Sequence, residues 1–192
     1  VASALMRLLP EDARTPTGRI DFDGTELLSL MESEMRAFRG ARIALIFQEP
    51  ATSFNPVMTV GAQIVEKLRG LRPELSAAEA RARVMALLHE VRINAPEERF
   101  YDYPSKYSGG MMQRAMIVDA LCTDPAVLIA DDIIRPLDVT VAAQIVGLLK
   151  ELCLKREMAV VFLASSLPVL RQVSHRAAVL QGGRLIEEQP VE

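Results

Sequence analysis

Two stretches decide the fold. The first is Tyr107-Ser108-Gly109-Gly110-Met111-Met112-Gln113-Arg114, and the second is Ala126-Val127-Leu128-Ile129-Ala130-Asp131-Asp132. A Ser-Gly-Gly turn that opens a helix presents backbone N–H groups and a hydroxyl toward an anion. A buried strand that ends in paired carboxylates is where α/β nucleotide-binding proteins hold Mg²⁺. In this order and spacing, the two stretches predict a site for phosphate and metal.

Strand patterns and helix patterns alternate along the rest of the chain. We expect strands over residues 19–24, 42–47, 126–130, 158–163, 177–180 and 184–187, and Pro50 should end pairing after the second of them. We expect helices over residues 1–9, 26–38, 60–71, 77–91, 109–121, 139–155 and 167–173, with an irregular connector over 96–104. The alternation predicts an α/β fold with a mostly parallel sheet, and the helix-only stretch 60–121 predicts an α-helical subdomain.

Composition narrows the possible functions. The 192 residues suit one domain with a subdomain, and the net charge of −3 gives no basic field, so no nucleic-acid partner is expected. The cysteines, Cys122 and Cys153, form no CxxC pair and lie in apolar helix patterns, which favours buried, reduced thiols. No apolar run approaches the length that spans a bilayer.

Several further blocks add to the first two stretches, and together they resemble the ATP-binding subunits of ATP-binding-cassette (ABC) transporters, in particular importers of oligopeptides and dipeptides. The blocks are Met6-Arg7-Leu8-Leu9-Pro10, Ile46-Phe47-Gln48-Glu49-Pro50, Ser53-Phe54-Asn55-Pro56, Asp102-Tyr103-Pro104 and Leu137-Asp138-Val139-Thr140. The resemblance implies an ABC-type P-loop NTPase core over about 1–58 and 122–192 and a helical subdomain over about 60–121. It also implies ATP and Mg²⁺ as ligands.

The resemblance assigns roles to individual residues. Gln48 would approach Mg²⁺ and the attacking water, Asp131 would orient Mg²⁺ through water, and Asp132 stands where the family has its general base. Asp138 would cross the dimer interface, and it can also cap the helix that follows. Four residues would contact the γ-phosphate of ATP bound on the opposite subunit: Ser108, Gly109, Gly110 and Gln113.

The sequence departs from the family at several points that bear on catalysis. No G-x-x-x-x-G-K-[ST] phosphate loop occurs, and the resemblance places Val1 just beyond its end, so we expect the first part of the domain to be missing. Asp132 is one methylene shorter than the family's Glu, and Ser165 replaces the family's switch histidine. Ile133, Ile134 and Arg135 replace small residues, which would put apolar bulk and a charge beside the nucleotide interface.

We therefore expect an ATP-binding subunit of a peptide import system. It would pair with a second ABC ATPase subunit, as a homodimer or heterodimer, and would bind membrane permease subunits at the cytoplasmic face of the membrane. The alternatives are a non-catalytic partner subunit in an asymmetric pair, or an inactive gene fragment. An ABC ATPase of DNA repair is less favoured, because the long coiled coils of those chains would give a heptad pattern.

Overall fold

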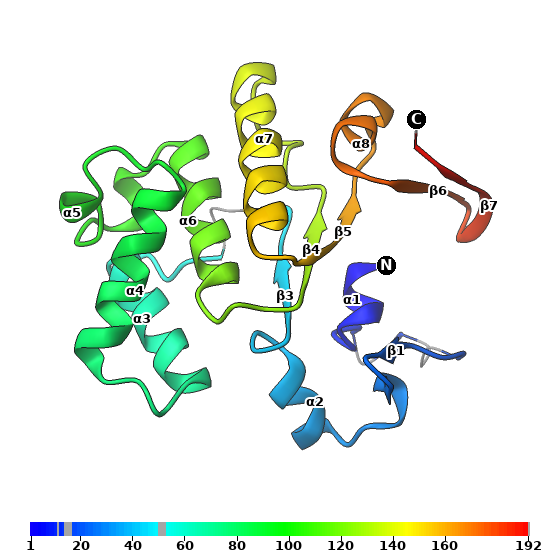
Figure 1. The fold of residues 1–192 in the computed structure, drawn as a ribbon, viewed down its shortest axis with the longest axis horizontal. Helices are drawn as coiled ribbons and strands as arrows, with labels where there is room; N and C mark the ends of the chain where they lie inside the picture. Colours follow the sequence, from blue (N-terminus) through cyan, green and yellow to red (C-terminus); the bar gives the residue numbers. More distant parts are fainter. Residues whose placement is uncertain (11, 14–16, 50–52, 192) are drawn as a thin grey trace.

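The computed structural model describes residues 1–10, 12–13, 17–49 and 53–191, so the expectation for Pro50 lies outside the described residues. Figure 1 shows the arrangement of the elements. They are α1 (Ala2–Leu5), β1 (Asp21–Phe22), β2 (Thr25–Glu26), the 3-10 helix η1 (Leu27–Ser29), α2 (Glu32–Phe38), β3 (Ile43–Ile46), α3 (Val60–Leu71), α4 (Ala77–Glu90), α5 (Pro96–Arg99), the 3-10 helix η3 (Pro104–Lys106), α6 (Gly109–Leu121), β4 (Val127–Asp131), α7 (Val139–Lys155), β5 (Ala159–Leu163), α8 (Leu167–Val173), β6 (Arg176–Gln181) and β7 (Arg184–Pro190).

The central sheet is parallel, with β4 between β3 and β5, as predicted. Ile46 pairs with Ala130, and Asp131 pairs with Leu163. Each crossover between these strands runs through a helix, α6 before β4 and α7 before β5. These helices return against the strand direction, so their N-termini lie at the edge where the strands end (Figure 1).

The alternation of side chains along the strands separates two cores. Ala44 and Ile46 of β3 join a large cluster that also contains buried residues of α3, α4, α6 and α7. Ile43 of β3 and Ile129 of β4 join a smaller cluster with residues of α1 and α2. Because successive strand residues face opposite sides, the sheet is covered by α6 and α7 on one face and by α1 and α2 on the other.

The N-terminal part is more broken than its apolar pattern predicts. Helix α1 ends at Leu5, and Arg7 has a left-handed backbone (φ 51°) while its guanidinium donates to the carbonyls of Leu27 and Leu30. The helix expected over 26–38 is interrupted at Leu30 and Met31, whose backbones are extended, and the Met31 N–H donates to the Glu34 carboxylate as α2 begins. Local side-chain hydrogen bonds thus override the helical periodicity.

The helical stretch follows the prediction closely. Helix α4 begins at the capping box in which Ser76 accepts from the N–H of Glu79 while the Glu79 carboxylate accepts from the N–H of Ser76. The connector over 96–104 is less irregular than expected, since it contains α5 and η3, each with a proline in its first turn. The large cluster is continuous from α3 and α4 to the sheet, so this stretch shares a core with the rest of the chain.

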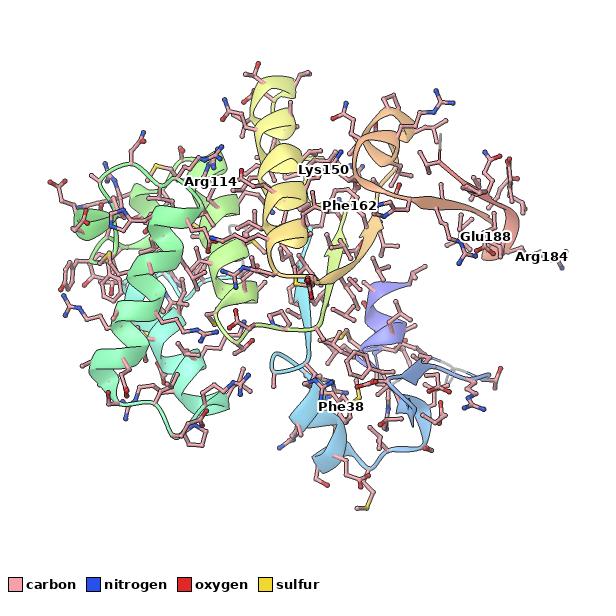
Figure 2. The ribbon with its side chains drawn as sticks, viewed as in Figure 1. Phe38, Arg114, Lys150, Phe162, Arg184 and Glu188 are labelled. Carbon is pink, nitrogen blue, oxygen red and sulfur yellow. The ribbon has the colours of Figure 1, made fainter. Side chains whose placement is uncertain are left out.

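The C-terminal hairpin stands apart from these layers. Strands β6 and β7 pair antiparallel around Gly182 and Gly183, both with positive φ, as the predicted turn requires. Figure 2 shows Arg184 and Glu188 on this hairpin, at the side of the molecule away from α3 and α4. Its apolar residues Leu180, Leu185 and Ile186 are about half exposed. Both strands therefore add little to the two cores.

The structure shows the surroundings of the two cysteines and the length of each helix, on which two predictions were made from composition. Cys122 and Cys153 are free, and burial raises the pKa of each thiol to about 11, so both are protonated and unreactive at neutral pH. The predicted burial is thus complete for Cys122 and partial for Cys153. Among the described residues, every helix is too short or too polar to cross a bilayer.

Gly61 should be required for the packing of α3. A Cβ at this position would lie 2.4 Å from the Phe100 ring and 2.6 Å from the Phe100 carbonyl oxygen, to which the Gly61 N–H donates. We expect Gly61→Ala to lower the free energy of unfolding by about 1–3 kcal/mol, measured by urea unfolding. Gly147→Ala is the control, because Gly147 lies mid-helix in α7 with open space around its Cβ, and it should raise stability by up to about 1 kcal/mol. Equal effects of the two changes would contradict this account.

Candidate functional site

The ends of the three parallel strands bring the predicted site residues to one edge of the sheet. Gln48 follows β3, Asp131 ends β4 with Asp132 after it, and Ser165 follows β5. In α/β sheets this carboxyl edge is where ligands bind. Gln48 and Asp131 line the same cavity, of about 650 Å³, so the structure places together the two residues that were predicted to hold the metal.

Asp132 sits at a sharp change of chain direction. Its backbone is left-handed (φ 49°), and its N–H donates to the Leu163 carbonyl at 2.9 Å, which extends the β4–β5 ladder by one bond. A residue other than glycine held at positive φ stores strain of about 1–3 kcal/mol, which is typical of functional sites. The carboxylate lies 3.8 Å from the Arg135 guanidinium, so a cation stands beside the position of the family's base.

The two isoleucines after Asp132 correct one expectation. Ile133 and Ile134 are 0% and 8% exposed and belong to the large core cluster, so they do not lie beside a nucleotide interface. The turn from Asp132 directs both side chains inward, where apolar groups are stable. Only Arg135 of this segment faces outward, as the expectation of a nearby charge requires.

The N-termini of α6 and α7 lie next to each other at the same edge. Ser108 caps α6 by accepting from the N–H of Met111, and Asp138 caps α7 by accepting from the N–H of Val141 at 2.9 Å. A Cβ on Gly110 would lie 2.9 Å from the Val141 side chain, so this glycine lets the first turns of the two helices touch. The first turns of α6 and α7 therefore meet, and each helix start offers N–H groups that are not used within the helix.

The residues predicted to contact a phosphate divide into two groups. Ser108 and Gly109 are exposed, and a Cβ on Gly109 would meet no atom within 4 Å. Gln113 is fully buried, and neither its Nε2 nor its Oε1 has a hydrogen-bond partner in the described part of the chain. The expectation that Gln113 contacts a phosphate directly does not fit this burial, because the amide lies in the core and not at the open start of the helix.

The cavity also contains residues that the sequence did not single out. Lys67 of α3 and Asp119 of α6 line it, joined by an ion pair of 2.5 Å, and Lys67 also donates to the Asp119 carbonyl. These residues are distant in sequence and match no motif, so no local pattern could have placed them together. Their pairing ties α3 to α6 on the wall of the cavity that faces Gln48 and Asp131.

The donor set can be tested against Mg²⁺. Amide and carboxylate oxygens suit this ion, which binds through one or two carboxylates and completes its shell with water and phosphate oxygens. Among the described residues, there is no group of three or more His, Cys, Asp or Glu side chains that could enclose a metal. Gln48 and Asp131 therefore fit a Mg²⁺ ion that is shared with a phosphate ligand, and they do not fit a metal held by protein alone.

Comparison with known proteins identifies the class. The family described as "ABC transporter" matches residues 2–135. The fold also matches a dimeric ATP-binding cassette, MJ0796, solved in a post-hydrolysis state with ADP and Pi, with a TM-score of 0.80 and 25% identity over 92% of this chain and 74% of that one. The chain belongs to the ABC transporter family, in which nucleotide binding is the shared property, and it has the α/β cassette fold.

Curated relatives refine the subfamily. The chain is 44% identical over 191 residues to a probable peptide ABC transporter ATP-binding protein of Sinorhizobium fredii, across 99% of this chain and 57% of the relative. It is 42% identical over 187 residues to a dipeptide transport ATP-binding protein of Bacillus subtilis, across 97% of this chain and 56% of the relative. The chain thus spans just over half of each of these proteins, and the resemblance to peptide-importer ATP-binding proteins is confirmed.

The capping role of Asp138 can be separated from any role of its charge. Asp138→Ala removes the acceptor for the Val141 N–H and should lower the free energy of unfolding by about 1 kcal/mol. Asp138→Asn keeps an oxygen in the same place, so its stability in urea unfolding should stay within a few tenths of a kcal/mol of the parent. If the asparagine variant lost as much stability as the alanine variant, the capping bond would not be the cause.

Proposed function

We propose that this chain is the ATP-binding part of an ABC importer for peptides. The observation that carries the proposal is that Asp131, Asp132 and the start of α7 lie at the carboxyl edge of the sheet, while the first turn of α6 touches the first turn of α7. Positive helix ends attract phosphate, and the carboxylates suit its counter-ion. The peptide class is supported by the relatives, which include dipeptide and oligopeptide transport ATP-binding proteins of Bacillus subtilis.

Different residues of this chain would bind the metal ion and the phosphate. Asp131 and Gln48 would hold Mg²⁺, which when bound neutralises charge on the phosphate oxygens. Ser108, Gly109 and Gly110 would offer a hydroxyl and N–H groups to the terminal phosphate of a nucleotide on a second subunit. Asp138 would lie at the same interface, at the start of α7 beside Gly110.

Because some of these residues would bind a nucleotide on a second subunit, the proposed assembly is a dimer. A nucleotide held between two subunits needs a dimer, homomeric or heteromeric, and the similarity to the dimeric cassette MJ0796 supports it. Residues 60–121 would form the helical subdomain that contacts the permease, and residues 1–58 and 122–192 would form the core. The subunit would then lie peripherally at the cytoplasmic face of the membrane.

A second candidate is a non-catalytic partner in an asymmetric ATPase pair. The residue at the position of the family's general base favours this candidate. Asp132 has a shorter side chain than the family's Glu, and its carboxylate lies beside the Arg135 guanidinium. Ser165 also has a shorter reach than an imidazole. Such a subunit would present Ser108 to Gly110 to its partner's ATP without hydrolysing its own.

Nucleotide-dependent dimerisation tests the assembly. We expect the full-length protein to dimerise with Mg²⁺ and ATP, measured by light scattering after size-exclusion chromatography. Gly109→Asp should abolish this, because it adds an anion to the proposed phosphate surface where the side chain has room. An aspartate in the first turn also favours the helix, so the loss would not reflect unfolding.

Gly109→Asn is the matched control for this experiment, since it adds the same bulk without the charge. It should weaken dimerisation less than Gly109→Asp does, because its side chain occupies space at the phosphate surface but does not repel the phosphate. If the two variants behaved alike, or if the parent failed to dimerise with nucleotide, the proposed phosphate surface would be wrong.

Turnover distinguishes the two candidate functions. Restoring the family residues, Asp132→Glu with Ser165→His, should raise the ATPase rate of the full-length protein at least about 100-fold if these positions limit it. Phosphate release with and without Mg²⁺ is the measurement. If the parent already hydrolyses ATP at the rate of the restored protein, the non-catalytic role is excluded. If the restored protein keeps a low ATPase rate, residues 132 and 165 do not limit catalysis.

A further inference from the structure

A connected set of ion pairs lies at the edge of the sheet opposite the proposed nucleotide site. Asp124 precedes β4, and Lys155 and Arg156 precede β5, so these residues stand where the strands begin. Arg83 and Glu90 reach them from α4. The five residues come from three segments far apart in sequence, and none of them takes part in the proposed site. We call them the charged cluster.

The distances join the charged cluster into one chain. Arg83 contacts Asp124 at 2.5 Å, and the other carboxylate oxygen of Asp124 contacts Arg156 at 2.5 Å. Arg156 also contacts Glu90 at 2.6 Å through its second terminal nitrogen. Lys155 contacts the remaining oxygen of Glu90 at 2.6 Å. Both carboxylates are therefore shared between two cations, and Arg156 bridges them.

Burial separates this cluster from ordinary surface pairs. The side chains of Glu90 and Arg156 are each 20% exposed, and the Nε of Arg156 is buried with no hydrogen-bond partner in the part of the chain that the structure describes. Arg92 and Glu151 also join the end of α4 to α7, at 2.6 Å, but their side chains are 65% and 59% exposed. The chain thus provides an exposed pair and a buried pair between the same two regions.

Glu90 occupies an unfavourable position unless it is paired. It is the last residue of α4, where the helix dipole presents partial negative charge. Burial opposes its ionisation as well, yet the hydrogen bonds from Lys155 and Arg156 outweigh burial and hold the pKa of Glu90 below its usual value. The ionised carboxylate therefore favours the arrangement in which α4 lies against the end of α7.

We propose that the charged cluster is a latch that fixes α4 to the start of the sheet, so that opening it releases α4 while the sheet and α7 stay folded. Apart from the cluster, α4 is attached here by the apolar contacts of Val84, Leu87 and Leu88 with the large core and by the hydrogen bond from Arg83 to the Cys122 carbonyl. Apolar contacts are not directional, whereas the shared carboxylates fix both distance and angle. The latch therefore sets how the helical stretch is oriented to the sheet.

Hydrogen–deuterium exchange of the full-length protein, without nucleotide, tests the latch. Glu90→Gln removes the shared charge and keeps the size of the side chain. We expect amide exchange in α4 to rise about tenfold or more, and exchange in β4 and α7 to stay within about twofold. Glu151→Gln is the matched control, because it breaks the exposed pair between the same regions, and it should change exchange in α4 by less than about twofold.

A second variant tests whether the rise in exchange reflects a general loss of stability. Arg156→Gln should give the same regional pattern, and adding it to Glu90→Gln should raise exchange in α4 by less than the product of the two single effects, since both act through one contact. An equal rise in β4 and α7, no rise in α4, or an equal effect of Glu151→Gln would overturn the proposal. These outcomes do not depend on nucleotide binding, so they are independent of the proposed transport function.

Discussion

The parallel register of β3, β4 and β5 is the constraint on which the rest of this structure depends. It aligns Ile46 with Ala130 and Phe162, so the residues that follow the three strands emerge at one edge. It also sends Ile43 and Ile129 to one face and Ala44 and Leu128 to the other. A shift of one residue in any strand would exchange these faces and expose the apolar set. The same register that buries the core therefore assembles the site.

Glycine sets how closely the helices approach this sheet and one another. Gly110 permits the first turns of α6 and α7 to touch, and Gly61 permits α3 to lie against the Phe100 backbone. Gly109, beside Gly110, meets no neighbouring atom, so nothing in the packing of this chain accounts for the absence of a side chain there. A pair of glycines with different surroundings suggests two separate demands, one from packing and one from a ligand.

The sequence alone predicts the strands, the capping residues and the edge at which the site lies. These features depend on local patterns, such as the Ser76–Glu79 capping box and the apolar run that ends at Asp131. It does not predict the burial of Gln113 or of Ile133 and Ile134, because burial depends on which face of a turn or helix meets the sheet. The break between η1 and α2 does not follow from the periodicity either, because the Glu34 carboxylate accepts from the Met31 N–H and starts a new helix in the middle of the apolar pattern.

The two edges of the sheet carry opposite electrostatic character, and the crossover helices explain why. Helices α6 and α7 run against the strands, so their positive N-termini gather where the strands end and their negative C-termini gather where the strands begin. The first edge holds Asp131, Asp132 and the free N–H groups of α6 and α7. At the second edge, the carbonyls of Cys122 and Thr123, which follow α6, accept hydrogen bonds from Arg83 and Arg72. Cations from α4 and from the end of α3 thus stabilise the end of α6 that points away from the proposed site. One helix direction therefore places N–H groups at one edge of the sheet and the attachment of the helical stretch at the other.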